Sequence, residues 1–208
     1  VWLLFLIYGC CFEMELFVNG RAAIYYQERF ELSEYTAVLF ASLFGLMNIF
    51  ARSLGGWLGD RFAASGGLTG RVRALVLVMV CEGLMLVVFS RMGTIGLAVG
   101  AMVVFSLFVQ MAEGATYSVV PFINKRSLGA VSGIVGAGGN VGAVVYAQFL
   151  LQSGAPLEDC FLYYGVAVAV IGLLGFGVRF SEEAEASARQ EYETNSGVAV
   201  IDTAGVPA

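Results

Sequence analysis

Long apolar runs dominate this 208-residue chain and limit what it can fold into. Six stretches approach the length of about 20 apolar residues that an α-helix needs to cross the roughly 30 Å hydrocarbon core of a bilayer. Their apolar residues run continuously rather than alternating with polar ones, which excludes the strands of a membrane barrel. The sequence therefore predicts an all-α integral membrane protein with six transmembrane helices, at residues 1–23, 36–58, 74–89, 94–120, 128–151 and 160–180.

Composition supports a lipid environment and excludes several functions. Hydrophobic residues make up 59% of the chain and charged residues 13%, whereas soluble domains average about 45–50% and about 25%. The chain has no histidine, which excludes histidine-based acid–base catalysis and the usual zinc sites. A net charge of -5 argues against a nucleic-acid partner. We therefore expect the lipid bilayer as a partner, and neither enzyme chemistry, a cofactor nor a metal.

The chain divides into two parts of different character. Residues 1–180 hold the six predicted helices, and residues 181–208 form an acidic segment that we expect to be a solvated, poorly ordered tail. The first residue is Val1 rather than methionine, and it already lies in an apolar run. This beginning is typical of a chain cut at the start of a membrane helix.

The distribution of lysine and arginine predicts the orientation in the membrane. With six spans, the segment ends fall alternately on two sides. Three arginines lie on one side, namely Arg21, Arg29 and Arg91. Seven basic residues lie on the other side, namely Arg61, Arg71, Arg73, Lys125, Arg126, Arg179 and Arg189. The positive-inside rule places this second side, with the C-terminal tail, in the cytoplasm, and we expect the plasma membrane.

Arg52 lies inside the second predicted span, where an ionised side chain costs at least about 2.5 kcal/mol. Asn48 precedes it by four residues and shares its helix face. On one interpretation, the guanidinium binds an oxyanion in a dry cavity, aided by the amide. On the other, Arg52 is structural and either pairs with Glu113 or another carboxylate or extends to the membrane surface. The sequence leaves both interpretations open.

Polar side chains also follow one face of the first span. Tyr8, Phe12, Glu15 and Asn19 are spaced by four, three and four residues, so they form a single stripe. The aromatic pair is suited to sandwiching a flat ligand, and Glu15 is a candidate proton carrier. The alternative is a packing seam between helices that contains one satisfied acid.

The fourth span carries a second candidate acid. Gln110, Glu113 and Tyr117 recur at helical spacing and form a polar face near its end. We interpret this face as part of a gate or a proton path, with Glu113 as the candidate proton carrier.

The fifth span is unusually rich in glycine, with five glycines in residues 132–142. Each glycine inside a helix costs about 1 kcal/mol relative to alanine, so this density needs a reason. Gly138 and Gly142 have the spacing that lets helix backbones approach. Asn140 projects on the same face as Gly136, where an amide beside bare backbone is suited to binding a small anion. Packing alone remains the alternative.

A loop is predicted at residues 60–73, between the second and third spans, and the pattern Gly56-x-x-x-Asp60-Arg61 leads into it. A carboxylate at this position can cap the positive N-terminal end of another helix, while arginines contact lipid headgroups. We expect Asp60 to cap the fifth span, which begins near Ser127, and the pattern to act as a conformational latch.

These motifs together resemble one family. The Gly56 to Arg61 pattern resembles the loop motif of the major facilitator superfamily, and residues 50–56 resemble the eighth-helix arginine motif of its nitrate/nitrite porter family. Glu15-Leu16 and Arg29-Phe30 fit the seventh-helix region of the eukaryotic high-affinity members. Residues 120–122, 126–129 and 136–143 resemble the family's eleventh-helix nitrate signature.

The resemblance covers most of the predicted bundle and implies a fold. The chain is expected to be the C-terminal half, helices seven to twelve, of a twelve-helix transporter, with the N-terminal six-helix half as its partner. By the same resemblance the substrate-binding residues are Arg52, Tyr8, Phe12, Gly136, Gly138, Gly139 and Asn140.

The function so implied is transport of nitrate or nitrite by alternating access. Because a negative membrane interior opposes anion entry by about 2.3 kcal/mol per charge per 100 mV, uptake requires a coupled cation, and we expect proton symport. Two alternatives stay open. One is exchange of nitrate for nitrite, and the other is a sensor or partner half-protein that does not transport.

Overall fold

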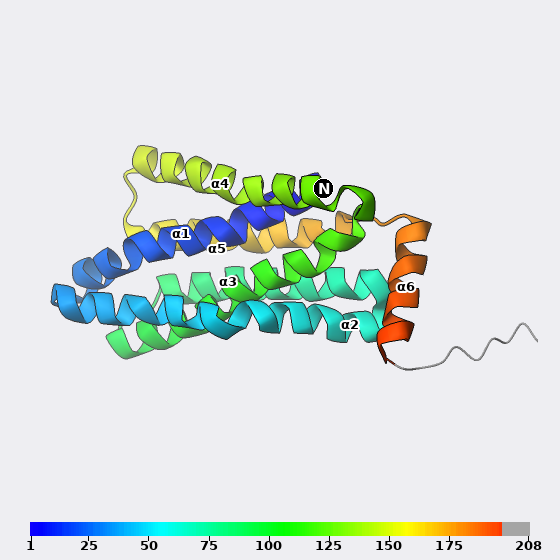
Figure 1. The fold of residues 1–208 in the computed structure, drawn as a ribbon. Helices are drawn as coiled ribbons and strands as arrows, with labels where there is room; N and C mark the ends of the chain where they lie inside the picture. Colours follow the sequence, from blue (N-terminus) through cyan, green and yellow to red (C-terminus); the bar gives the residue numbers. More distant parts are fainter. Residues whose placement is uncertain (197–208) are drawn as a thin grey trace, which may run out of the picture.

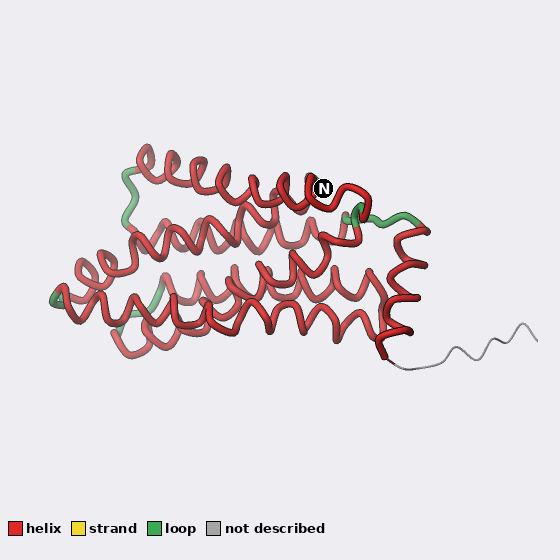
Figure 2. The backbone as a smooth tube through the Cα atoms, viewed as in Figure 1, coloured by secondary structure: helices red, strands yellow, loops and turns green. Residues whose placement is uncertain are grey.

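The computed structural model describes residues 1–196, and all regular secondary structure in that part is helical (Figure 2). Five of these helices are long and apolar enough to cross a membrane. The α-helices are α1 (Trp2–Phe30), α2 (Glu34–Ser90), α3 (Ile95–Val119), α4 (Leu128–Ser153), α5 (Leu157–Leu173) and α6 (Glu182–Ser196), of which α6 is not among those five. Three short 3-10 helices complete the fold, namely η1 (Val120–Phe122), η2 (Lys125–Ser127) and η3 (Leu174–Gly177).

Helix α2 contains both the second and the third predicted span, because the loop predicted at residues 60–73 is helical except at Gly67. There the backbone takes φ 57° and ψ -147°, a conformation that glycine adopts far more readily than other residues. The chain reverses at this point, so that residues 34–66 and 68–90 form two arms (Figure 1). Asp60 and Arg71 form an ion pair across the turn, whereas a straight helix would separate them by about 16 Å.

Helix α1 occupies the centre of the bundle. It packs mainly on α4 and also contacts α2, α3 and α5, while α2 packs mainly on α3 and α5. The connections α1–α2, α2–α3 and α4–α5 lie at one end of the bundle (Figure 1). The turn at Gly67, the α3–α4 connection and α6 lie at the other end, which we call the α6 end.

Aromatic side chains fill the core toward the end opposite α6. The ring of Phe89 on α2 lies within 5.0 Å of three other rings, measured between centroids: Tyr25 of α1, Phe105 of α3 and Phe161 of α5. Edge-on and tilted contacts of this kind add about 0.5–1.5 kcal/mol each beyond the buried area. They hold four of the helices in a fixed arrangement around the interior.

Glycines set the closest helix contacts. At Gly138 and Gly142 of α4, a Cβ atom would overlap the backbones of Phe5 and Gly9 on α1. The packing interpretation of their four-residue spacing is therefore confirmed. Gly55 of α2 likewise faces the backbone of α3 at Met111.

The contact between α2 and α3 has a second glycine, which lies beside the buried arginine. A Cβ atom at Gly114 of α3 would overlap the carbonyl oxygen of Arg52 on α2. The two backbones therefore meet directly at the level where Arg52 leaves its helix. This close crossing brings the side chains of α3 within reach of the guanidinium.

Part of the segment expected as a poorly ordered tail is helical. Helix α6 begins with Glu182, Glu183 and Glu185, whose charges stabilise a helix N-terminus, and the Ser181 hydroxyl accepts a hydrogen bond from the Ala184 amide. Residues 182–190 are also rich in alanine, glutamate, arginine and glutamine, which favour helix. Residues 197–208 of that segment lie outside the described residues.

Replacing Gly114 with alanine is expected to destabilise the protein, because the new methyl group forces the α2 and α3 backbones apart at Arg52. Overpacking of this kind costs about 1–3 kcal/mol. Thermal unfolding of the purified protein in detergent measures the effect. Gly45→Ala is the matched control, since nothing lies within 4 Å of a Cβ atom there. Equal unfolding temperatures for the two variants would contradict the close crossing.

Candidate functional site

Three charged side chains from three helices meet inside the bundle. Nη2 of Arg52 on α2 lies 2.5 Å from Glu15 Oε2 of α1 and 2.5 Å from Glu113 Oε2 of α3. Glu113 is almost fully buried, and 38% of the Arg52 side chain is exposed within the chain. We call Arg52, Glu15 and Glu113 the charged triad. The structure thus brings together the predicted arginine and both predicted proton carriers.

Two amide side chains complete the contacts of the triad. Asn48 Nδ2 donates a hydrogen bond of 2.7 Å to Glu15 Oε1. Arg52 Nε donates one of 3.0 Å to Gln110 Oε1. The Gln110 Nε2 atom is buried and donates to no partner in the described structure. Asn48 therefore orients Glu15, while Gln110 offers a free donor next to the guanidinium.

The sequence placed Gln110 on the same face as Glu113 but did not assign it to Arg52. Its three-residue spacing from Glu113 puts the two side chains one above the other on α3. The missing information was the register between α2 and α3, which the Gly114 contact sets. Helical spacing within one segment gives the face of a side chain, not its partner on another helix.

The two predicted aromatic residues contact each other. The rings of Tyr8 and Phe12 are stacked with centroids 5.5 Å apart and planes 17° apart. Tyr117 of α3 packs edge-on against Tyr8 at 5.1 Å. At this separation the stacked pair leaves no gap for a flat anion between its rings. Tyr8 is buried and Phe12 is partly buried, so Phe12 is the ring of the pair that a ligand can reach.

The glycine-rich helix contributes to the site with only some of its predicted residues. A Cβ atom at Gly139 would overlap the Phe12 ring, and one at Gly136 would lie 3.3 Å from the Tyr117 hydroxyl. Both glycines therefore border the aromatic cluster. Gly138 instead packs on the α1 backbone. Asn140 lies two residues from both Gly138 and Gly142, so it projects from the side of α4 that faces away from α1. It is exposed.

The latch residues have other partners than predicted. Arg71 Nη1 lies 2.5 Å from Asp60 Oδ1 and donates to the Ser118 carbonyl oxygen at 3.4 Å, and its guanidinium lies 4.8 Å from the centre of the Phe122 ring. The expected cap on the fifth span is wrong: Asn124 accepts hydrogen bonds from the backbone near the start of α4. These amides belong to η2, which precedes α4, and Asp60 pairs across the Gly67 turn instead.

The other two residues of the latch pattern make few contacts. Arg61 is exposed at the α6 end of the first arm of α2. Gly56 is partly buried, and a Cβ atom there would have open space within 4 Å. In the described part of the chain, no group of three or more histidine, cysteine or carboxylate residues could hold a metal ion.

Comparisons with known proteins agree on one family. The chain is 44% identical over 154 residues to "High affinity nitrate transporter 2.5" of Arabidopsis thaliana, covering 74% of this chain and 30% of that protein. It is 34% identical over 186 residues to "Nitrate transporter 2.1" of Chlamydomonas reinhardtii, covering 86% and 34%. It is 36% identical over 154 residues to "Nitrate/nitrite transporter NrtP" of Picosynechococcus sp., covering 73% and 28%.

The chain spans about a third of the length of these relatives. No family model matches it, and no solved structure matches it. The three relatives quoted are named as transporters, and they come from Arabidopsis thaliana, Chlamydomonas reinhardtii and Picosynechococcus sp.. The chain therefore belongs to the nitrate/nitrite porter family.

Proposed function

We propose that the protein to which this chain belongs transports nitrate or nitrite across a membrane, with Arg52 as a ligand of the anion. The observation that carries the proposal is the guanidinium of Arg52 inside a bundle of apolar helices, on a side where it stays partly exposed. A buried structural arginine would need no such opening. The names of the relatives supply the class of substrate.

The chain is proposed to be one six-helix half of a twelve-helix transporter. Each arm of α2 is long enough to cross a bilayer, so α1, the two arms, α3, α4 and α5 supply six crossings. Two of the residues concerned, Tyr117 and Asn140, are exposed in this chain, and Arg52 is partly exposed. The second half of the transporter would cover all three. Alternating access then follows from rocking of the two halves about the site between them. The lysine and arginine bias favours a cytoplasmic α6 end, and the plasma membrane is proposed as the location.

The chemistry around Arg52 suits a small planar anion. A guanidinium presents two parallel N–H groups to an oxyanion. The unpartnered Gln110 Nε2 atom can add a third donor, and the partly exposed Phe12 ring offers a flat apolar surface. Gly136 and Gly139 border that surface without side chains of their own, and Asn140 is proposed to close on the anion from α4.

Arg52→Lys in the full-length protein is expected to reduce nitrate uptake by about 10- to 100-fold, because a charged hydrogen bond contributes about 1.5–3 kcal/mol. An ammonium keeps the charge but lacks the paired N–H groups. Uptake of labelled nitrate into proteoliposomes measures the loss. The control is Arg73→Lys, at an exposed arginine near the Gly67 turn, which should transport normally. Near-normal uptake by Arg52→Lys would remove Arg52 from the binding site.

Proton coupling is proposed to act through the charged triad. With both carboxyls ionised, the triad carries one excess negative charge and repels an anion. A proton on Glu15 or Glu113 makes the triad neutral overall. Protonation also weakens the ion pair between that carboxyl and the guanidinium of Arg52. The N–H groups of Arg52 then become available to nitrate. Binding of a proton and of the anion are thereby linked, as symport against a negative interior requires.

Nitrate uptake by the wild-type protein is expected to fall as the pH rises. In Glu113→Gln most of this fall is expected to disappear. The amide cannot ionise, so one of the two negative charges that compete with nitrate is permanently absent. Uptake into proteoliposomes, measured over a pH series with and without a proton gradient, checks this. Glu28→Gln, at an exposed glutamate of α1, should keep the wild-type pH profile. An unchanged profile in Glu113→Gln would exclude Glu113 as the carrier, and gradient-independent exchange of nitrate for nitrite at the full rate would favour an exchanger.

The latch is proposed to act through the Asp60–Arg71 pair together with Gly56 and Arg61. Arg71 contacts the end of α3 through the Ser118 carbonyl, so the pair connects the Gly67 turn of α2 to α3. Breaking this connection changes how easily the α6 end opens.

Asp60→Asn is therefore expected to change the maximal rate of transport several-fold and to leave the affinity for nitrate unaltered. Initial rates over a range of nitrate concentrations separate the two effects. The matched control is Asp159→Asn at the opposite end, where Asp159 pairs with Arg91 at 3.4 Å. A change confined to the apparent affinity would contradict a latch.

A further inference from the structure

Helix α1 carries a second buried acid on the side away from the charged triad. Glu13 precedes Glu15 by two residues, which places it roughly 200° around the helix. Only 2% of Glu13 is exposed, and its Oε2 atom accepts no hydrogen bond in the described structure. The triad does not neutralise it, since the ion pairs of Arg52 go to Glu15 and Glu113.

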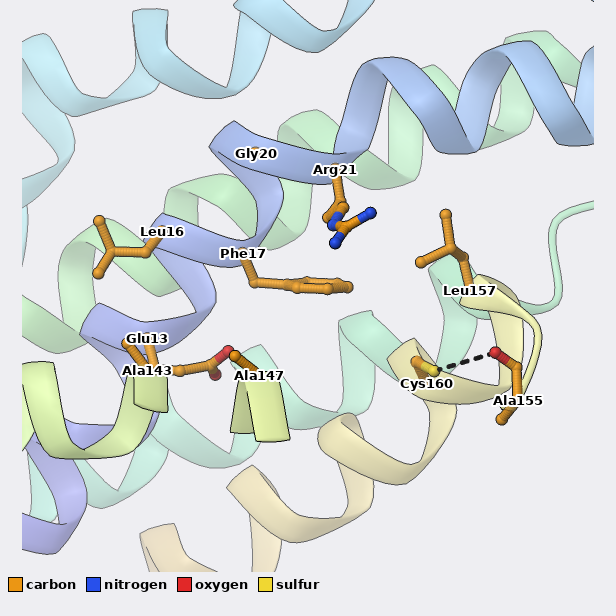
Figure 3. A pocket seen from close by; sticks show the side chains of 10 residues that line it. All are labelled: Glu13, Leu16, Phe17, Gly20, Arg21, Ala143, Ala147, Ala155, Leu157 and Cys160. Carbon is orange, nitrogen blue, oxygen red and sulfur yellow. Dashed lines mark hydrogen bonds between the residues drawn. The ribbon is translucent and has the colours of Figure 1, made fainter. Parts of the chain in front are cut away.

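Glu13 lines a cavity of about 550 Å³ between α1, α4 and the start of α5 (Figure 3). Leu16, Phe17 and Gly20 form its α1 wall, and Ala155 and Leu157 border it at the α4–α5 turn. The cavity therefore lies toward the end of the bundle opposite α6. Arg21 also lines it and is exposed, so the cavity joins the surface to a buried carboxyl.

Glu82 is a further buried acid near Glu13. Glu82 on the second arm of α2 is fully buried, and neither of its carboxyl oxygens accepts a hydrogen bond in the described structure. It lies close enough to Glu13 for their charges to interact. The neighbouring Gly83 packs directly on the Gly165 backbone of α5, so α5 lies close against this part of α2.

No basic side chain forms an ion pair with either acid in the described part of the chain. The titratable groups near Glu13 are Cys10 of α1, Tyr146 of α4 and Tyr164 of α5, and the Tyr164 side chain hydrogen-bonds to Glu13. Those near Glu82 are Cys10, Cys11 and Glu113. Tyr164 donates a hydrogen bond of 2.5 Å to the Cys10 carbonyl oxygen. Arg21 lines the cavity without an ion pair to Glu13 in the described part of the chain.

An isolated carboxylate in an apolar interior is too costly to persist, and such a group takes up a proton instead. Two neighbouring carboxyls without a counter-ion oppose ionisation of both. From this geometry we infer that Glu13 and Glu82 form a second proton-binding site, filled from the cavity at the end opposite α6. The site holds a proton independently of nitrate. Its assignment to transport rests on the proposed function.

The position of this site suggests the direction of proton entry. The charges of Glu82 and Glu13 interact, and so do those of Glu82 and Glu113 of the charged triad. A proton that enters through the cavity meets Glu13 first, because Glu13 is the acid that lines the cavity.

Infrared difference spectroscopy of the purified full-length protein, without nitrate, tests the site. The carbonyl stretching band of protonated carboxyl groups is recorded at neutral pH and after a step to alkaline pH. Glu13→Gln and Glu82→Gln are each expected to lose a component of this band. Glu28→Gln, which neutralises an exposed glutamate on the same helix, should retain the whole band. A band identical in all four proteins would overturn the proposal.

A second measurement needs no substitution, so a folding defect in the variants cannot obscure the result. Dicyclohexylcarbodiimide, an apolar reagent for protonated carboxyls, is added to the wild-type protein in liposomes, and mass spectrometry locates the adduct. Labelling of Glu13 should fall as the pH rises. Labelling that follows the sodium concentration at constant pH, or no labelling of Glu13 at any pH, would overturn the site. Neither measurement involves nitrate, so failure of transport and failure of this site give different results.

Discussion

The arginine–carboxylate contact inside the bundle is the interaction on which the arrangement of the first three helices depends. Arg52 cannot be left alone among apolar side chains, because removing a charge from water costs far more than a membrane protein's marginal stability allows unless a partner compensates it. Glu15 and Glu113 provide that compensation from two other helices. Under the proposed function Arg52 has two roles. While both acids are ionised it holds three helices together, and when one is neutral its N–H groups are proposed to bind the anion.

The interior of the chain is organised around the two faces of α1. One face brings Glu15 to Arg52 and Tyr8 to Tyr117, and the other brings Glu13 to the cavity and to Tyr164. Direct backbone contact at glycines makes this possible. It lets α4 lie against α1 at Gly142 and lets α3 lie against α2 at Gly114, so that short polar side chains can reach across. The charged and the aromatic groups are thereby held at fixed separations without large side chains between the helices.

Much of this could be predicted from the sequence, and the limits have physical reasons. Apolar length predicted six spans, and the structure has five helices of sufficient length and apolarity, of which α2 contains two predicted spans. Helical spacing placed Glu15 and Glu113 on polar faces, because it depends on neighbours along the chain. The Gly138–Gly142 spacing correctly predicted a backbone contact. The predicted loop at residues 60–73 was wrong because helix is lost only at Gly67. The partner of Asp60 was also wrong, and that of Gln110 was not identified, because pairing between helices depends on register, which one segment does not encode.

The contact between α1 and α4 has a consequence for motion. Gly138 and Gly142 fix the two helices at one level, while Ala143 and Ala147, which follow along α4, face open space next to Glu13. A tilt of α4 about the glycine contact would widen or narrow that space at the far end and change little at the contact itself. The access of water to Glu13 would then depend on the angle between two helices. Glycines, which have no side chains, would thus act as a hinge that controls the hydration of a buried acid.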